Sequence, residues 1–189
     1  MRPNKRDELV QKALEIFYQN GFHATGMDLI AAGTGVSKTS IYKHFRTKED
    51  LILAVLRLRD EKFRNWLIRR MEELGQTPKE QLIAMFDALA EWYGEPKFRG
   101  CMFIKASGEY QEASHPIHAQ AAEHKRLLFS YVEALAKKAG AKNPAELARQ
   151  LLLLKEGSIV TAHLGHCKNP ALDAKNAAAM LVAAALLQK

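Results

Sequence analysis

Several features are scarce in this sequence of 189 residues, and each absence excludes a class of protein. Two cysteines, Cys101 and Cys167, are too few for the disulfide framework of a small secreted domain. No apolar run reaches the roughly 20 residues that a membrane-spanning helix needs, and no apolar stretch follows the charged first residues as it would in a secretory signal. We therefore expect a soluble, cytoplasmic protein that does not contact a membrane.

Strand signals are also few, whereas helix signals are frequent. β-branched residues rarely alternate with polar ones, and the sequence has no Asn-Gly hairpin turn. Prolines and capping residues precede apolar periodic segments, and glycines follow them. The pattern predicts an all-α fold of about nine helices. Two of its details are a capping box from Thr25 to Asp28 and a short helix from Cys101 to Ala113.

The composition suits a self-sufficient core and a polyanionic partner. Hydrophobic residues make up 48% of the chain, which is long enough to bury a core without disulfides or metal. The formal net charge is +7, which is typical of proteins that bind nucleic acid. His163, His166 and Cys167 lie close in sequence, but no second ligand cluster accompanies them. We expect no cofactor and no metal.

Residues 27–45 match the physical requirements of a helix-turn-helix. The first helix needs a small residue where the second crosses it, and Ala31 supplies it. The turn needs a residue that tolerates positive φ, which Gly35 provides. Val36 and Ile41 are the apolar anchors, and Ser37 is better placed to cap the second helix than to contact DNA. The outer face of that second helix is then left for polar donors.

The same stretch resembles the DNA-binding domain of the TetR family of bacterial repressors. The resemblance covers about residues 6–55 and consists of Ile-Ala at 30–31, Gly-Val-Ser at 35–37, Tyr-x-His-Phe at 42–45 and Lys-Glu-x-Leu at 48–51. The sequence departs from the family pattern at Gly26, Thr34 and Thr39. The resemblance implies a helix-turn-helix DNA-binding domain in residues 1–50 and a ligand-binding and dimerisation domain in residues 51–189.

The resemblance also implies which residues touch DNA. Lys38, Thr39 and Lys43 would lie nearest the bases, whereas Tyr42 and His44 would mainly hold phosphates. For His44 a half-buried ring bonded within the motif is the alternative. The full set implied to contact a palindromic operator is Thr25, Lys38, Thr39, Ser40, Tyr42, Lys43, His44 and Lys48.

The remaining residues are expected to pair two copies and to enclose an effector. The family resemblance implies a homodimer through the last two long helices, where Leu147, Leu151, Leu154, Ser158 and Thr161 recur at helical spacing. The alternative, which does not exclude the first, is that these faces form an internal core. A small, largely apolar organic effector would release the operator, with residues 48–74 as the lever shared by both domains. The residues that we expect to bind the effector are Trp92, Phe103, Tyr110, Phe129 and His163.

Three alternatives to an effector-released repressor remain open. Cys101 follows Gly100 at the start of a predicted helix, with Arg99 and Lys105 close in sequence, so an electrophile-sensing or redox-sensing regulator is one of them. A non-specific basic helical interaction module is the second, and an activator with the same DNA-binding domain is the third. We do not expect an enzyme, because no catalytic motif is present and glutamates such as Glu109 and Glu112 are interpreted as solvated helical faces.

Overall fold

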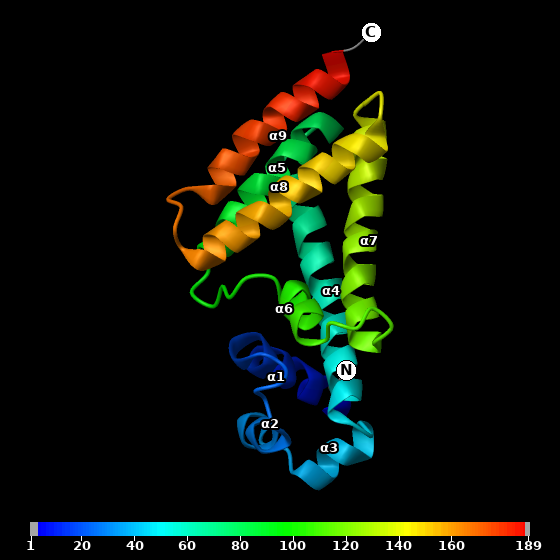
Figure 1. Ribbon diagram of the computed structural model, residues 1–189, viewed down its shortest axis with the longest axis vertical. Helices are drawn as coiled ribbons and strands as arrows, with labels where there is room; N and C mark the ends of the chain where they lie inside the picture. Colours follow the sequence, from blue (N-terminus) through cyan, green and yellow to red (C-terminus); the bar gives the residue numbers. More distant parts are fainter. Residues whose placement is uncertain (1–3, 188–189) are drawn as a thin grey trace. The chain divides into compact units, whose positions relative to one another are not determined.

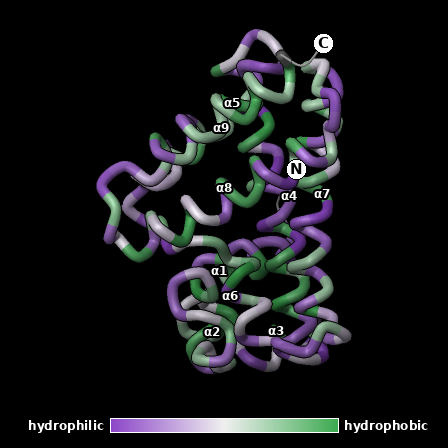
Figure 2. Tube along the Cα trace, turned by 45° about the horizontal axis from the view of Figure 1, so that its top comes forward, coloured by the Kyte–Doolittle hydropathy of each residue, from purple (hydrophilic) through white to green (hydrophobic). Residues whose placement is uncertain are grey.

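The computed structural model describes residues 4–187, and these form nine α-helices and no strand (Figure 1). The all-α prediction is therefore confirmed. The helices are α1 (Lys5–Asn20), α2 (Met27–Thr34), α3 (Lys38–His44), α4 (Lys48–Leu74), α5 (Pro78–Tyr93), α6 (Met102–Glu109), α7 (Pro116–Lys138), α8 (Pro144–Leu164) and α9 (Pro170–Leu187). Figure 2 shows hydrophobic and hydrophilic segments alternating along these helices, as expected for helices that bury one face.

The chain divides into two compact units. Unit 1 is the chain up to Lys62 together with Met102–His124, and unit 2 is Phe63–Cys101 together with the chain from Lys125 onward. The helices α4 and α7 each begin in unit 1 and end in unit 2. Unit 1 thus includes α6 and the first part of α7, which lie far from its other residues in the sequence. The functional boundary at residue 50 stays a prediction.

Unit 1 is built around the predicted core of the helix-turn-helix. Leu9, Ala13 and Phe17 of α1 are buried, and so are Ile30 of α2 and Ile41 of α3. Helix α1 packs on α2, and α2 packs on α3. The core is made of the apolar residues that the helical spacing placed on one face, so local periodicity accounts for it.

The predicted capping box at the start of α2 is wrong. The N-cap of α2 is Gly26, which makes no side-chain cap hydrogen bond. The Thr25 hydroxyl instead donates to the carbonyl oxygen of Gly21 at 2.6 Å. The helix begins one residue later than the capping box requires, and the Thr25 side chain is turned toward the preceding loop. Thr25 therefore stabilises the loop before α2 rather than the helix itself.

Helix α6 is shorter than the predicted helix from Cys101 to Ala113. It ends at Glu109, and the backbone N–H of Tyr110 makes the last helical bond, to Ala106 O at 2.9 Å. Just beyond the helix, His118 Nδ1 donates to Tyr110 O at 2.8 Å. A tertiary hydrogen bond thus holds the residue that follows α6, and no local signal in the sequence predicts it.

Unit 2 contains α5, α8 and α9, with α5 and α8 both packed on α9. The face of α9 that packs on them carries small residues, Ala174, Ala178 and Val182, which are buried and let the helix axes approach closely. Leu147 and Leu151 of α8 are buried within the unit, as the alternative of an internal core predicts, and the dimer stays a prediction. Among residues 4–187, no helix combines the length and the apolar character that crossing a membrane requires.

Candidate nucleic-acid interface

The turn between α2 and α3 has the predicted geometry. Gly35 ends α2 with φ +70°, in the left-handed region that favours glycine, and its N–H donates to Ala31 O at 3.0 Å. Ser37 caps α3 by accepting a hydrogen bond from Ser40 N at 3.2 Å. Ile41 is fully buried, which anchors one side of α3. The roles predicted for Gly35, Ser37 and Ile41 are confirmed.

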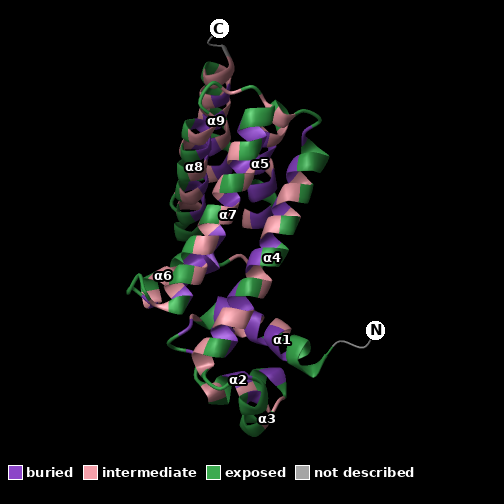
Figure 3. Cartoon of the chain, turned by 90° about the vertical axis from the view of Figure 1, so that its right-hand side faces the viewer, coloured by how far each residue is buried: buried purple, intermediate pink, exposed green. Residues whose placement is uncertain are grey.

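The opposite side of α3 is open to solvent. Lys38, Thr39, Tyr42, Lys43 and His44 are all exposed, and Figure 3 shows α3 almost entirely in the colour of exposed residues. Tyr42 is 49% exposed although it is a large aromatic residue. The exposure of His44 does not fit the alternative of a half-buried ring. Five of the predicted DNA contacts therefore share one accessible surface, which we call the α3 face.

Lys38 and Ser40 are partly engaged within the protein. Lys38 Nζ lies 2.6 Å from Asp28 Oδ1, but both side chains are exposed, so the pair stabilises the fold little. A DNA phosphate can replace Asp28 as the partner at small cost. Ser40 is half-buried, and its hydroxyl accepts a hydrogen bond from Ser37 Oγ at 3.0 Å. Lys38 is thus better placed than Ser40 to reach a ligand.

Thr25 and Lys48 lie elsewhere than the DNA-contact prediction expects. The Thr25 side chain is fully buried, so it offers no surface to a phosphate in this conformation. Lys48 Nζ donates to the carbonyl oxygens of Phe22, at 3.1 Å, and of Thr25, at 3.3 Å. Both side chains hold the loop between α1 and α2. We therefore leave Thr25 out of the interface and assign Lys48 first to this loop.

The interpretation of Glu109 as a solvated residue is wrong. Its two carboxylate oxygens each lie 3.0 Å from the backbone nitrogen of Phe22, and Oε2 lies 2.5 Å from that of His23. Phe22 and His23 lie 87 and 86 positions from Glu109 along the chain. Neither spacing nor periodicity in the sequence could have found this contact.

A groove of about 460 Å³ in unit 1 adds positive charge beside the α3 face. Three of its lysines are Lys5, Lys12 and Lys43, against the single carboxylate of Glu8. Lys12 Nζ donates to Thr34 O at 2.9 Å, which holds its cationic group near the helix-turn-helix. The groove and the α3 face together present the basic, hydrogen-bonding surface that a phosphate backbone attracts. Sequence reasoning missed Lys5 and Lys12, because they lie on α1 outside the motif.

Comparison with known proteins agrees with this geometry. The sequence profile described as "Bacterial regulatory proteins, tetR family" matches residues 9–55, the part of the chain that contains α2, α3 and the α3 face. The chain is 25% identical to the HTH-type transcriptional regulator YjdC of Escherichia coli over 155 residues, which cover 82% of this chain and 81% of YjdC.

The chain is similar to transcriptional regulators of the TetR family.

Two further proteins are similar to this chain. It is 36% identical over 91 residues to the HTH-type transcriptional repressor KstR2 of Mycolicibacterium smegmatis, covering 47% of this chain and 42% of KstR2. Its fold matches the crystal structure of SCO4454, a TetR-family transcriptional regulator from Streptomyces coelicolor, with a TM-score of 0.81 and 29% identity. That match covers 96% of this chain and 93% of SCO4454. These similarities support a DNA-binding transcriptional regulator.

The residues predicted to bind an effector are divided between the two units. Phe103 and Tyr110 lie in unit 1, whereas Trp92, Phe129 and His163 lie in unit 2. The Phe103 ring stacks on buried His124, with centroids 3.7 Å apart. Within unit 2, Trp92 and His163 both contact the ring of Phe98, with centroid distances of 4.9 and 6.2 Å. A common effector site for the five residues stays a prediction.

Unit 2 of the regulator also holds a buried charged cluster. Lys155 is 1% exposed, and its Nζ bonds Glu156 Oε1 at 2.8 Å, while Lys125 Nζ bonds Glu156 Oε2 at 2.7 Å. Burial acts to raise the pKa of Glu156, but the two ammonium groups outweigh it and lower the pKa to about 2. Burial lowers the pKa of Lys155. Lys125 Nζ also lies 3.5 Å from Cys101 Sγ.

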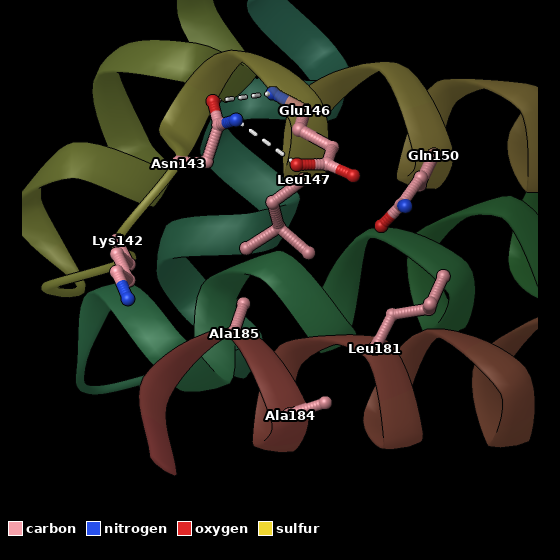
Figure 4. A pocket seen from close by; sticks show the side chains of 8 residues that line it. All are labelled: Lys142, Asn143, Glu146, Leu147, Gln150, Leu181, Ala184 and Ala185. Atoms are coloured by element: carbon pink, nitrogen blue, oxygen red, sulfur yellow. Dashed lines mark hydrogen bonds between the residues drawn. The ribbon is translucent and has the colours of Figure 1, made fainter. Parts of the chain in front are cut away.

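A second groove, of about 570 Å³, lies at one end of α8 and α9 (Figure 4). Leu147, Leu181 and Ala185 provide apolar lining, while Glu146 and Gln150 contribute polar side chains. Figure 4 shows the bonds between Asn143 and Glu146 that begin α8 at this edge. Its mixed lining differs from the largely apolar site that we expect for the effector. Among the described residues, no group of three metal-ligating side chains is present.

Proposed function

We propose that this chain is a ligand-responsive repressor that binds a palindromic operator as a dimer. The observation that carries the proposal is the α3 face, where Lys38, Thr39, Tyr42, Lys43 and His44 are exposed while Ile41 anchors the helix from behind. An α-helix with this arrangement fits a DNA major groove, with donors for base edges and phosphates. A regulator that binds DNA acts where the DNA is, so cytoplasmic location is part of the proposal.

Exposed apolar residues on α8 and α9 support the dimer. Leu153 and Leu164 of α8 are 72% and 67% exposed, and Leu172 and Met180 of α9 are 50% and 69% exposed. A cluster of exposed large apolar side chains on one pair of helices is typical of an interface. One helix-turn-helix reads only a few base pairs, so two copies give the affinity that an operator requires.

The proposed effector acts by shifting a population of conformations. A largely apolar organic molecule would bind in unit 2 beside Trp92, Phe129 and His163, and would favour a dimer whose two α3 faces do not match successive major grooves. The aromatic contacts of Trp92 with Phe63 and Phe98, both at 4.9 Å, support the apolar character. Helix α4 supplies residues to both units and is the proposed lever.

Selection of genomic fragments by the purified protein at physiological salt, followed by sequencing, tests the proposal. We expect a short inverted repeat to be recovered upstream of a small number of genes. Addition of the effector, identified from compounds related to the products of those genes, should release the fragments. Recovery of fragments with no shared sequence would support a non-specific basic interaction module instead. Lower transcription with the regulator bound would establish the repressor assignment. This measurement is needed because similar proteins include both the repressor KstR2 and the activator FasR of Mycolicibacterium smegmatis.

A second candidate function is supported by one contact, the 3.5 Å between Lys125 Nζ and Cys101 Sγ. The Lys125 ammonium group is placed to donate a hydrogen bond to the Cys101 sulfur. In this candidate the Cys101 thiol gives its proton to water, and its sulfur adds to the double bond of an activated alkene. The new S–C bond leaves a carbanion that takes up a proton from water.

N-ethylmaleimide treatment tests the cysteine candidate. We expect one added maleimide on Cys101 and loss of operator binding. The matched control is Cys167→Ser, since Cys167 is the other cysteine and both are free thiols. That variant should keep the response, whereas Cys101→Ser should lose it. Operator release that persists in Cys101→Ser would exclude the candidate.

A further inference from the structure

We propose that Glu109 is a positioning residue for DNA recognition. From the end of α6 it holds the loop that joins α1 to the helix-turn-helix, and so sets the orientation in which the α3 face is presented. This inference rests on the proposed function, because its effect is measured on operator affinity. Glu109 itself lies outside the DNA-contact set.

The contact is a carboxylate that accepts hydrogen bonds from two consecutive backbone N–H groups. Glu109 Oε1 and Oε2 lie 3.0 Å from Phe22 N, and Oε2 lies 2.5 Å from His23 N. Hydrogen bonds to an ionised acceptor are shorter and stronger than neutral ones. A Cβ atom at Gly21 would lie 3.0 Å from Glu109 Oε1, so the carboxylate is packed directly against the loop.

The other backbone groups of this loop are held by side chains as well. Lys48 Nζ donates hydrogen bonds to the carbonyl oxygens of Phe22 and Thr25, and the Thr25 hydroxyl donates one to the carbonyl oxygen of Gly21. Gly21 itself has φ +81°, so the chain turns sharply where α1 ends. Glu109 therefore binds the donors of the loop while Lys48 and Thr25 bind its acceptors. We call this arrangement the Glu109 latch.

Rings next to the latch strengthen the contact with the end of α6. Phe22 is fully buried, and its ring centroid lies 6.5 Å from that of Tyr110. The His23 ring lies 4.6 Å from the same tyrosine, and His115 stacks on it at 4.7 Å. The backbone N–H of Phe22 is thus bonded to Glu109, and its ring packs against Tyr110, the residue that follows Glu109.

The latch affects DNA binding because α2 and α3 follow the loop directly. The direction in which residues 21–26 leave α1 determines where α3 lies relative to the rest of unit 1. Without the latch the loop samples several conformations, and only a fraction of them present the α3 face as the operator requires. The apparent dissociation constant then rises by the inverse of that fraction. Once the complex forms, the same phosphates are contacted, so the salt dependence stays unchanged.

The decisive experiment compares Glu109→Gln with Glu112→Gln, using the full chain and the operator selected as above. Both variants lose one negative charge from the same segment, but Glu112 is exposed and its carboxylate accepts from Ser114 Oγ rather than from the loop. Removal of a negative charge by itself strengthens attraction to DNA. We nevertheless expect Glu109→Gln to raise the operator Kd about tenfold, with an unchanged slope of log K against log salt. Glu112→Gln should bind at least as tightly as the unmodified chain.

Two further measurements separate positioning from general instability. Glu109→Asp keeps the charge on a shorter side chain, so we expect its operator Kd to lie between those of the unmodified chain and Glu109→Gln. In the unmodified chain, the amide hydrogens of Phe22 and His23 should exchange slowly, because both are bonded to the carboxylate. This exchange measurement does not require any variant to fold.

Three results would overturn the proposal. The first is a folded Glu109→Gln protein whose operator Kd lies within twofold of the unmodified value. The second is a change in its salt slope, which would indicate a lost phosphate contact. The third is rapid exchange of the Phe22 and His23 amides. If the unmodified chain selects no operator, the proposed function fails, and the exchange measurement still decides whether the latch forms.

Discussion

The buried pair between His124 and Asp60 leads to the sharpest stability prediction. His124 Nδ1 lies 2.7 Å from Asp60 Oδ1, and the side chains are 1% and 8% exposed. The pair joins α7 to α4 inside unit 1, and Phe103 of α6 stacks on the His124 ring with an interplanar angle of 9°. Three helices of unit 1 therefore meet at one buried hydrogen bond.

Asp60→Ala should destabilise the protein strongly. It removes the acceptor and leaves the buried imidazole without that partner, which costs about 3 kcal/mol. For a chain of this length, that corresponds to a decrease in Tm of about 6–12 °C. The measurement is thermal unfolding followed by circular dichroism at neutral pH. Because α6 carries Glu109, we expect the same variant to weaken operator binding.

The control is Asp87→Ala, which removes the same group from a more exposed pair. Asp87 Oδ1 lies 2.7 Å from Lys175 Nζ, and the two side chains are 41% and 34% exposed. Exposed ion pairs contribute about 0–1 kcal/mol, so Tm should decrease by less than about 4 °C. Equal decreases for the two variants would refute the reasoning, since burial would then have no influence on the cost of losing the partner.

Three further predictions concern the DNA contacts, the dimer and the acid limit of stability. Tyr42→Ala should weaken binding to all duplexes alike, whereas Lys43→Ala should also relax sequence preference. Competition between operator and unrelated DNA measures both effects. Unchanged affinity in both variants would remove these residues from the interface. Leu153→Glu should shift the chain from dimer to monomer in sedimentation at micromolar concentration, because it places a charge at a residue that is 72% exposed in the single chain; an undiminished dimer would exclude this part of α8. The pKa of Glu156 is about 2 in the folded chain, whereas its ordinary value is 4.5. The unfolded state therefore binds more protons below about pH 4.5, and the free energy of unfolding decreases as the pH falls from 4.5 to 2. Glu156→Gln should flatten the dependence of Tm on pH in that window, and an unaltered dependence would contradict the assignment.

The exposure of the predicted DNA-contact residues followed from the sequence for some side chains and not for others. Lys43 and His44 are exposed because Ile41 occupies the buried side of a regular helix, and that follows from helical period alone. Thr25 and Lys48 also match the family pattern, yet their hydrogen bonds point into the loop before α2. A motif specifies residue types and spacing, but not which partner each polar group finds after folding.

The sequence by itself determined the all-α fold, the turn at Gly35, the cap at Ser37 and the similarity of residues 9–55 to the TetR family. All of these depend on residues within a few positions of one another, where backbone geometry and periodicity act directly. The tertiary structure alone decided where α6 ends, which leucines of α8 are buried and what Glu109 binds. The physical reason is sequence separation. The bonds from Glu109 to Phe22 and His23 join groups 87 and 86 residues apart, and only the packed fold brings those groups within hydrogen-bonding distance.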